Sequence, residues 1–186
     1  NKKEIFMVSI EKIHHVAYRC HNAKATAEWY KEHLGMDLAV AISEDKVPST
    51  KEPDPYMHIF LDAGMGNVLA FFEITGAKEM SRDLNSPAWL QHIAFQVKDM
   101  EALEQAKGRL TEKGLDVIGI TNHCIFKSIY FHDLNGHRLE LCCNLGTADQ
   151  AKKLKEIAPG MLEKWDETKT PPKDAAWLHS EEFQND

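Results

Sequence analysis

Hydrophobic and polar residues follow one pattern that occurs twice along the chain. Each copy starts with a short apolar, strand-like stretch that contains a histidine and continues into a pattern typical of an amphipathic helix. The two copies cover residues 13–38 and 90–117. The interval from His15 to His92 is nearly the same as the interval from Gly35 to Gly114, the glycines that follow the two helical patterns. A repeat at a nearly constant spacing indicates two copies of one structural unit.

The helix in each copy has recognisable ends. Apolar residues recur every three or four positions behind Asn22 in the first copy and behind Asp99 in the second, and both residues are typical N-caps. Gly35 and Gly114 stand where the helices are expected to end. The apolar positions are Ala23, Ala27, Tyr30 and Leu34 in the first helix and Met100, Leu103, Ala106 and Leu110 in the second.

Three short runs with strand-forming character follow each helix, so each half of the chain predicts a βαβββ module. The runs cover residues 38–42, 57–61 and 67–74 in the first half and 116–120, 124–132 and 137–143 in the second. We therefore expect an α+β fold of two paired βαβββ modules. The expected boundaries are 8–76 for the first module, 77–88 for a connector, 89–145 for the second module and 146–186 for a C-terminal helix and tail.

The C-terminal extension combines a helical stretch at 148–157 with a polar tail that contains Trp165 and Trp177. Tryptophan has a large apolar ring that gains free energy when it is removed from water. We therefore expect the tail to dock, either on its own domain or on a second subunit.

Strand alternation selects one histidine in each first strand. The large apolar residues at the odd positions of 93–97 should face the helix, so His92 should face the other side of the sheet. The same alternation in the first half places His15, rather than its neighbour His14, on the equivalent side.

One acid stands among apolar residues in the last strand of each half. These acids are Glu73 and Glu140, and once differences in loop length are allowed for, we expect them to hold equivalent positions. A carboxylate removed from water needs a partner, and a metal ion is one such partner, whereas an outward position on an exposed face is the alternative for each acid. Together with His15 and His92, an acid on one of these matching last strands forms a 2-His-1-carboxylate set, which suits Fe(II), Mn or Ni with open coordination positions.

The composition argues against two classes of partner. The chain has 29 acidic and 22 basic side chains and a net charge of -7, whereas a protein that coats nucleic acid needs a cationic surface. No apolar run approaches the ~20 residues needed to span a bilayer. We therefore expect a small-molecule substrate and neither a nucleic acid nor a membrane as partner.

The four cysteines suggest a reducing compartment. They form no CxxC pair, and two of them are adjacent, at Cys142 and Cys143, so that they would point to opposite faces of a strand. Reduced thiols in a cytoplasmic protein are the simplest interpretation. A homodimer is the default expectation for a protein of this size.

The repeat and its histidines resemble the vicinal oxygen chelate superfamily, which includes glyoxalase I, extradiol ring-cleaving dioxygenases, epimerases and bleomycin-type antibiotic-resistance proteins. The resemblance covers residues 11–145. It implies that two βαβββ modules pair so that their sheets form a cleft around a divalent metal. It also implies that His15, His92 and Glu140 are the metal ligands, since they stand where the superfamily places them.

A more specific resemblance lies between Thr121 and Glu140. The order of His123, Ile129-Tyr130, Asp133, Gly136 and Glu140 resembles the extradiol dioxygenase signature, with Leu134 at a position where that pattern usually has proline. The resemblance implies an Fe(II)-dependent dioxygenase that acts on a small catechol-like substrate. It assigns the handling of the catechol protons to His123 and Tyr130. Fe(II) is therefore the expected cofactor, with Mn, Ni or Zn as alternatives.

Two features of the resemblance leave other functions open. Extradiol enzymes usually have a further histidine before the second ligand histidine, and no histidine occurs between His58 and His92. In addition, Glu73 stands where glyoxalase I and its relatives supply a fourth ligand, which would suit proton transfer better than oxygen chemistry. The first alternative is a glyoxalase-type lyase or epimerase with Glu73 as fourth ligand or base. The second is a metal-free protein of the antibiotic-resistance type that binds a small molecule.

Overall fold

The computed structural model of the chain describes residues 9–76, 80–81 and 83–180 and divides it into two compact units. Unit 1 comprises residues 1–84 with the turn 134–136, and unit 2 comprises residues 85–133 and 137–186. The elements of unit 1 are β1 (Val16–Arg19), α1 (Ala23–Leu34), β2 (Asp37–Glu44), β3 (Tyr56–Asp62) and β4 (Val68–Ile74). Those of unit 2 are β5 (Ile93–Gln96), α2 (Met100–Glu112), β6 (Ile118–Asn122), β7 (Phe126–His132), β8 (Arg138–Asn144), α3 (Ala148–Thr168) and a 3-10 helix η1 (Ala176–His179).

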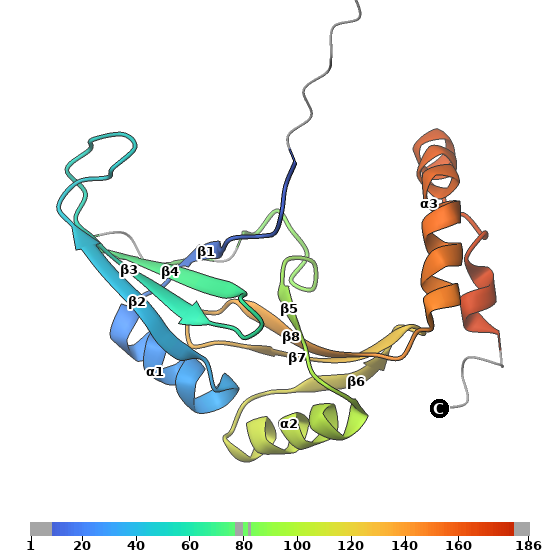
Figure 1. Ribbon diagram of the computed structural model, residues 1–186, viewed down its shortest axis with the longest axis horizontal. Coiled ribbons are helices and arrows are strands. Elements are labelled where there is room, and N and C mark those ends of the chain that lie inside the picture. The colour runs from blue at the N-terminus through green and yellow to red at the C-terminus, as the bar shows by residue number, and fades with distance from the viewer. Residues whose placement is uncertain (1–8, 77–79, 82, 181–186) are drawn as a thin grey trace, which may run out of the picture. The chain divides into compact units, whose positions relative to one another are not determined.

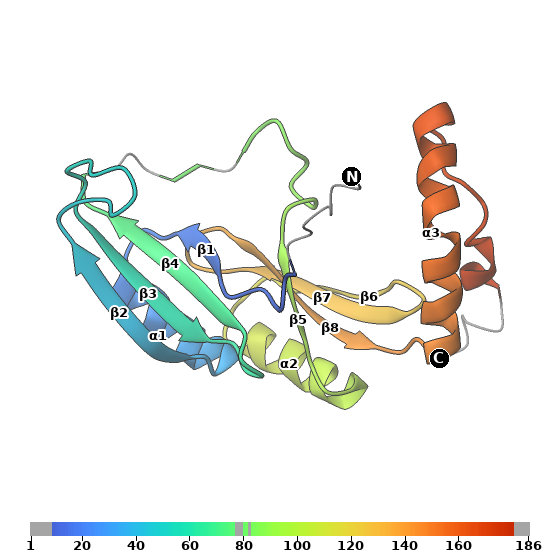
Figure 2. The ribbon, with the colours of Figure 1, turned by 45° about the horizontal axis from the view of Figure 1, so that its top comes forward.

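The two units contain sheets of the same topology. The strand orders are β1-β4-β3-β2 in unit 1 and β5-β8-β7-β6 in unit 2, with the first strand parallel to the last and the other neighbours antiparallel. Figures 1 and 2 show α1 along the sheet of unit 1 and α2 along the sheet of unit 2. The predicted α+β fold with two βαβββ modules and a C-terminal helix is confirmed. The module boundaries remain predictions, and residues 8, 77–79, 82 and 181–186 of those segments lie outside the described residues.

The helix ends form as the sequence indicates. The Asn22 side chain accepts a hydrogen bond from the Ala25 N–H (2.8 Å), and the Asp99 side chain accepts one from the Ala102 N–H (2.9 Å). Gly35 and Gly114 follow the two helices with φ angles of 72° and 85°, a region that favours glycine because it has no Cβ. These caps pair backbone donors and carbonyls that a helix end leaves unsatisfied.

The core of each unit lies between its helix and its sheet. Tyr30 and Phe71 are fully buried in unit 1, as is Leu103 in unit 2, where Phe131 is 1% exposed. Each fully buried side chain of this size stabilises the fold by roughly 1.5–3 kcal/mol. Because the helix covers one face of each sheet, the residues on the other face are the ones available for a functional site.

The C-terminal helix is longer than the sequence pattern suggests. It continues through Pro159 to Thr168, and it begins with a capping box between Thr147 and Gln150. Proline lacks an N–H and removes one helical hydrogen bond, and the carbonyl left over can bind water because this stretch is exposed. The tail turns back on the helix, with Lys153 Nζ 4.1 Å from the centre of the Trp177 ring. Trp177 therefore docks on its own helix, whereas Trp165 is 46% exposed.

Candidate metal centre

His92 and Glu140 form the centre of the candidate site in unit 2. His92 directly precedes β5, and Glu140 lies in β8, where it pairs with Ala94 of β5. His92 Nε2 is 2.8 Å from Glu140 Oε2, and the Glu140 side chain is only 4% exposed. Two of the three predicted ligands are thus brought together by the parallel pairing of β5 with β8.

The hydrogen bond of the other ring nitrogen of His92 shows which nitrogen bears a hydrogen. His92 Nδ1 is 2.9 Å from the carbonyl oxygen of Leu90, and because a carbonyl only accepts, Nδ1 bears the hydrogen. In the neutral ring, Nε2 then presents its lone pair to a carboxylate oxygen. A proton on Nε2 of a charged His92 ring satisfies this contact, and so does a metal ion shared by the two groups, because ligand atoms bound to one octahedral ion at about 2.1 Å lie about 3 Å apart. The residues present therefore fit a divalent metal.

Ser128 orients the carboxylate. Its hydroxyl donates a hydrogen bond to Glu140 Oε1, and the side chain is fully buried on β7. This bond leaves Oε2 directed at His92. Partners of this kind set the orientation and basicity of metal ligands. The sequence places Ser128 on the same strand face as Tyr130, but nothing in it identifies Glu140 as its partner.

Tyr130 and His123 lie next to this pair. Tyr130 is opposite Glu140 in the pairing of β7 with β8, and its ring centre is 5.8 Å from that of His92. Its hydroxyl is 2.8 Å from His123 Nε2, and the residue is 8% exposed. Burial, together with the negative charge of Glu140, raises the pKa of Tyr130, so that the phenol keeps its proton at neutral pH.

His15 stands in unit 1 among other rings. It directly precedes β1, so strand alternation does not separate it from His14, whose Nδ1 is 2.8 Å from His15 Nδ1. The rings of Phe60 and His58 are centred 5.6 and 6.2 Å from that of His15. Within each unit, no three His, Cys, Asp or Glu side chains of the described residues converge on one point. The ligand set of His15 with His92 and Glu140 therefore stays a prediction.

The model of one protein family matches residues 12–141, which is most of the chain and contains all of these residues. It is described as the Glyoxalase/Bleomycin resistance protein/Dioxygenase superfamily. The chain belongs to this superfamily. The resemblance to the vicinal oxygen chelate proteins is thereby confirmed, and so is membership of a group that includes metal-dependent enzymes.

Relatives within the superfamily have different chemistries. The chain is 33% identical to metallothiol transferase FosB of Shouchella clausii strain KSM-K16 over 124 residues, 60% of this chain and 83% of that protein. It is 26% identical over 83 residues, 45% of its length, to the "Putative ring-cleaving dioxygenase MhqA" of Bacillus subtilis strain 168, and the match spans only 26% of that protein. The fold also matches a single-residue mutant of the fosfomycin resistance protein FosX of Listeria monocytogenes in complex with Mn(II) and 1S,2S-dihydroxypropylphosphonic acid. That match has a TM-score of 0.53 and 19% identity and covers 78% of this chain and all of that one.

The predicted equivalence of Glu73 and Glu140 is wrong. Ala17 pairs with Ala70 in unit 1 as Ala94 pairs with Glu140 in unit 2, so the residue of unit 1 that corresponds to Glu140 is Ala70. Glu73 lies three residues further along β4 and therefore on the opposite face of the sheet. Its Oε2 accepts a hydrogen bond from the Ala23 N–H (2.6 Å) at the start of α1. Glu73 thus stabilises a helix N-terminus.

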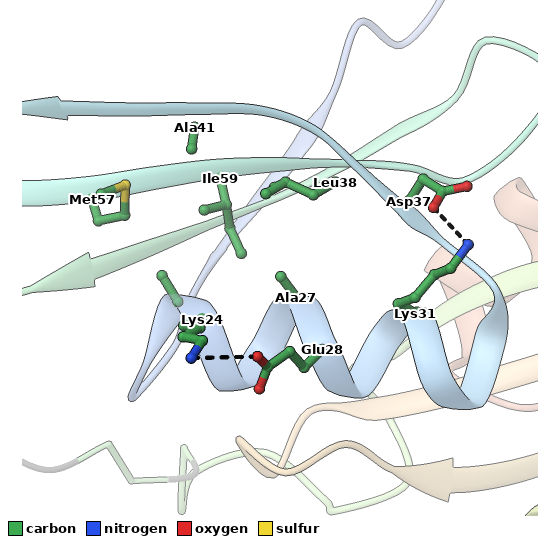
Figure 3. A pocket seen from close by; sticks show the side chains of 10 residues that line it. Lys24, Ala27, Glu28, Lys31, Asp37, Leu38, Ala41, Met57 and Ile59 are labelled. Atoms are coloured by element: carbon green, nitrogen blue, oxygen red, sulfur yellow. Dashed lines mark hydrogen bonds and ion pairs between the residues drawn. The ribbon is translucent and has the colours of Figure 1, made fainter.

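A pocket of about 550 Å³ in unit 1 lies apart from the candidate ligands, and none of the predicted site residues lines it. Figure 3 shows it between α1 and the strands β2 and β3, with the ion pairs Lys24–Glu28 (3.7 Å) and Lys31–Asp37 (2.6 Å) at its edge. The other lining residues are Ala23, Ala27, Leu38, Ala41, Met57 and Ile59. It belongs to the helix-covered side of the sheet.

Proposed function

We propose that this chain is an Fe(II)-dependent extradiol-type dioxygenase that cleaves the ring of a small catechol-like substrate. The observation that favours this chemistry is the hydrogen bond between His123 and Tyr130, next to the pair of His92 and Glu140 in one unit. In the proposed site, His15, His92 and Glu140 hold the metal. When bound, Fe(II) supplies open coordination positions for the two oxygens of a catecholate and for dioxygen.

Tyr130 and His123 move the catechol proton in this proposal. In this proposal the Tyr130 hydroxyl, 2.8 Å from His123 Nε2, keeps its hydrogen at neutral pH and donates it to that nitrogen when the nitrogen is unprotonated. A catechol hydroxyl that donates to Tyr130 Oη can therefore pass its proton through the phenol to the imidazole, which becomes charged. A positioned acid or base of this kind contributes typically 10²–10⁴-fold to a rate.

The alanine in the first module supports oxygen chemistry over the glyoxalase-type alternative. Ala70 stands where a fourth protein ligand would correspond to Glu140, and Glu73 is bonded to a helix N-terminus. A set of three protein ligands leaves more coordination positions for substrate than a set of four. The proposal of Glu73 as ligand or base is therefore not retained.

The test uses protein loaded with Fe(II) under anaerobic conditions and then exposed to oxygen and a panel of catechols. We expect oxygen uptake with formation of a coloured ring-fission product. Tyr130→Phe should lower kcat/KM at least about 100-fold while metal affinity stays within twofold. Tyr30→Phe, which removes a phenol from the core of unit 1, is the matched control and should not change turnover. No oxygen uptake with any catechol would refute the proposal.

A second candidate function is metal-dependent thiol transfer. It is favoured by the 33% identity with metallothiol transferase FosB over 83% of that protein. The same three ligands would serve it, and Tyr130 would contact the acceptor. Incubation of Mn(II)-loaded protein with fosfomycin and cysteine, followed by mass spectrometry, should then give a covalent adduct. Adduct formation without oxygen uptake on catechols would replace the first proposal by this one.

We also infer that the chain forms a homodimer in the cytoplasm. On the side of the outer strand β2 that faces away from α1, Val40 and Ile42 are 46 and 44% exposed, and in this proposal a second copy covers them. Cys20, Cys124, Cys142 and Cys143, which all lie in the part of the chain that the structure describes, form no disulfide bond, as expected in a reducing compartment. None of the helices described is long and apolar enough to cross a membrane. Light scattering after size exclusion tests the dimer, with a monomer at micromolar concentration as the contrary result.

A further inference from the structure

Arg138 lies on the same sheet face as the candidate metal ligand of unit 2. It is the first residue of β8, two positions before Glu140, so the two side chains point to the same side. Its guanidinium carbon is 4.3 Å from the centre of the Tyr130 ring. The rise of two residues separates Arg138 from Glu140 by about 7 Å along the strand, a span that one substituted benzene ring can bridge.

The guanidinium of Arg138 has no anionic partner among the residues that the structure describes. Its Nε is buried and makes no hydrogen bond. The acid nearest along the strand, Glu140, directs its two oxygens to Ser128 and His92. Arginine remains charged at any physiological pH and presents its donors in a planar fork. A buried donor left without an acceptor costs about 1–3 kcal/mol, so a group of this kind needs an explanation.

We propose that Arg138 binds a carboxylate on the substrate, so that the natural substrate is a catechol-like aromatic acid rather than a neutral catechol. A carboxylate matches the guanidinium fork with two parallel hydrogen bonds and supplies the missing acceptor. The inference rests on the proposed function for the catechol part of the substrate. For the carboxylate part it rests only on the position and the unpaired state of Arg138.

The stacking of Arg138 on Tyr130 gives the competing explanation. A guanidinium over an aromatic face is attracted to it by about 0.5–1 kcal/mol at exposed sites and more where water is excluded. If Arg138 only positions the Tyr130 ring, its removal must affect neutral and anionic ligands equally. If it binds the substrate carboxylate, its removal must affect only ligands that have one.

The experiment measures binding to Mn(II)-loaded protein by titration calorimetry with 3,4-dihydroxybenzoate, catechol and benzoate. We expect the wild-type protein to bind 3,4-dihydroxybenzoate at least about 10-fold more tightly than catechol. Arg138→Gln should remove that difference, with catechol affinity changed less than twofold. Arg138→Lys should give an intermediate loss, because lysine keeps the charge but not the fork. Arg109→Gln, the same change at an exposed position of α2, is the matched control.

The outcomes separate this inference from the proposed function. Equal affinity of the wild-type protein for 3,4-dihydroxybenzoate and catechol would overturn the inference. An equal loss of affinity for these two ligands in Arg138→Gln would also overturn it, as would a failure of the wild-type protein to bind 3,4-dihydroxybenzoate or benzoate. Arg138-dependent binding of benzoate without oxygen uptake on any catechol would support the inference while refuting the dioxygenase. Cleavage of catechol and 3,4-dihydroxybenzoate with the same kcat/KM, in both the wild-type protein and Arg138→Gln, would support the dioxygenase while refuting the inference. Circular dichroism and urea midpoints check that each variant is folded.

Discussion

The sheets of unit 1 and unit 2 have the same strand order but differ at one paired position. Where the first and last strands pair, unit 1 has Ala17 beside Ala70, and unit 2 has Ala94 beside Glu140. The carboxylate of Glu140 in unit 2 contacts two polar side chains, those of His92 and Ser128. The comparison teaches that both sheets have the same backbone arrangement at this position, and that the side chain there decides which sheet has a candidate metal ligand.

The helices of the two units differ in a complementary way. The first turn of α2 has its own acid, Glu101, behind the Asp99 cap, whereas the first turn of α1 has none behind Asn22. In unit 1 the missing negative charge comes from the sheet, through Glu73. Negative charge at a helix N-terminus is stabilising. Each module therefore has an acid at the N-terminus of its helix, but the acid comes from a different place in the sequence. An acid in the last strand is thus structural in one unit and a candidate ligand in the other.

The largest effect that tests this comparison is expected from Glu140→Gln. The amide keeps the shape of the side chain but loses the charge that faces His92 Nε2. We expect Mn(II) affinity to fall at least about 100-fold. Loss of a residue that only hydrogen-bonds to a metal ligand lowers metal affinity by up to about 100-fold, and loss of a ligand itself should lower it at least as much. Electron paramagnetic resonance of free Mn(II) measures it. Retained affinity would show that the metal binds elsewhere.

A smaller effect on the same measurement is expected from Ser128→Ala. Without the hydroxyl, Glu140 Oε1 loses its donor in a buried place, and the carboxylate is free to turn away from His92. We expect Mn(II) affinity to fall about 10–100-fold. Ser43→Ala on β2, whose hydroxyl bonds only to the carbonyl of Tyr56 among the described residues, is the control. Equal affinities of the two variants would contradict the role of Ser128.

Much of the fold follows from the sequence, because hydrophobic alternation and helix caps are local. The same alternation selects the sheet face of Ala94 and Glu140. The error at Glu73 arose from matching two acids by residue type across the two halves of the chain. The strands themselves give a different offset between the two halves. Asp62 ends β3 and His132 ends the corresponding strand β7, and the distance in sequence between these two residues is three positions longer than that between Glu73 and Glu140. A shift of three positions reverses the side of a strand, so the two acids face opposite ways.

The contacts of Ser128 and Arg138 could not be predicted in the same manner. Strand alternation places both on the site face, but their partners depend on side-chain rotamers and on which neighbours are already paired. The contact of His123 with Tyr130 joins the loop before β7 to the middle of that strand. From the sequence, only the resemblance to the dioxygenase signature predicted that His123 and Tyr130 belong to one site.

The structural acid gives a prediction of intermediate size, on stability alone. Glu73→Gln removes the negative charge that accepts from the Ala23 N–H. We expect the free energy of unfolding to fall by about 1 kcal/mol, as for other losses at a helix N-terminus. Urea denaturation measures it, and Mn(II) affinity measured in parallel should stay within twofold. A large loss of metal affinity instead would restore Glu73 as a ligand and remove the difference between the units.

The smallest expected effect concerns the histidine cluster of unit 1 and its response to pH. Burial against Phe72 and the neighbouring charge of His15 lower the pKa of His58 below its ordinary value of 6.5. The unfolded chain therefore takes up this proton first as the pH falls, so the contribution to stability is complete above pH 6.5 and declines below it. His58→Phe removes the titrating group and keeps the stacking. The loss of unfolding free energy between pH 7 and pH 5, measured in urea on metal-free protein, should thus be smaller in the variant. An equal loss in both proteins would mean that the His58 ring is as well solvated in the folded sheet as in the unfolded chain.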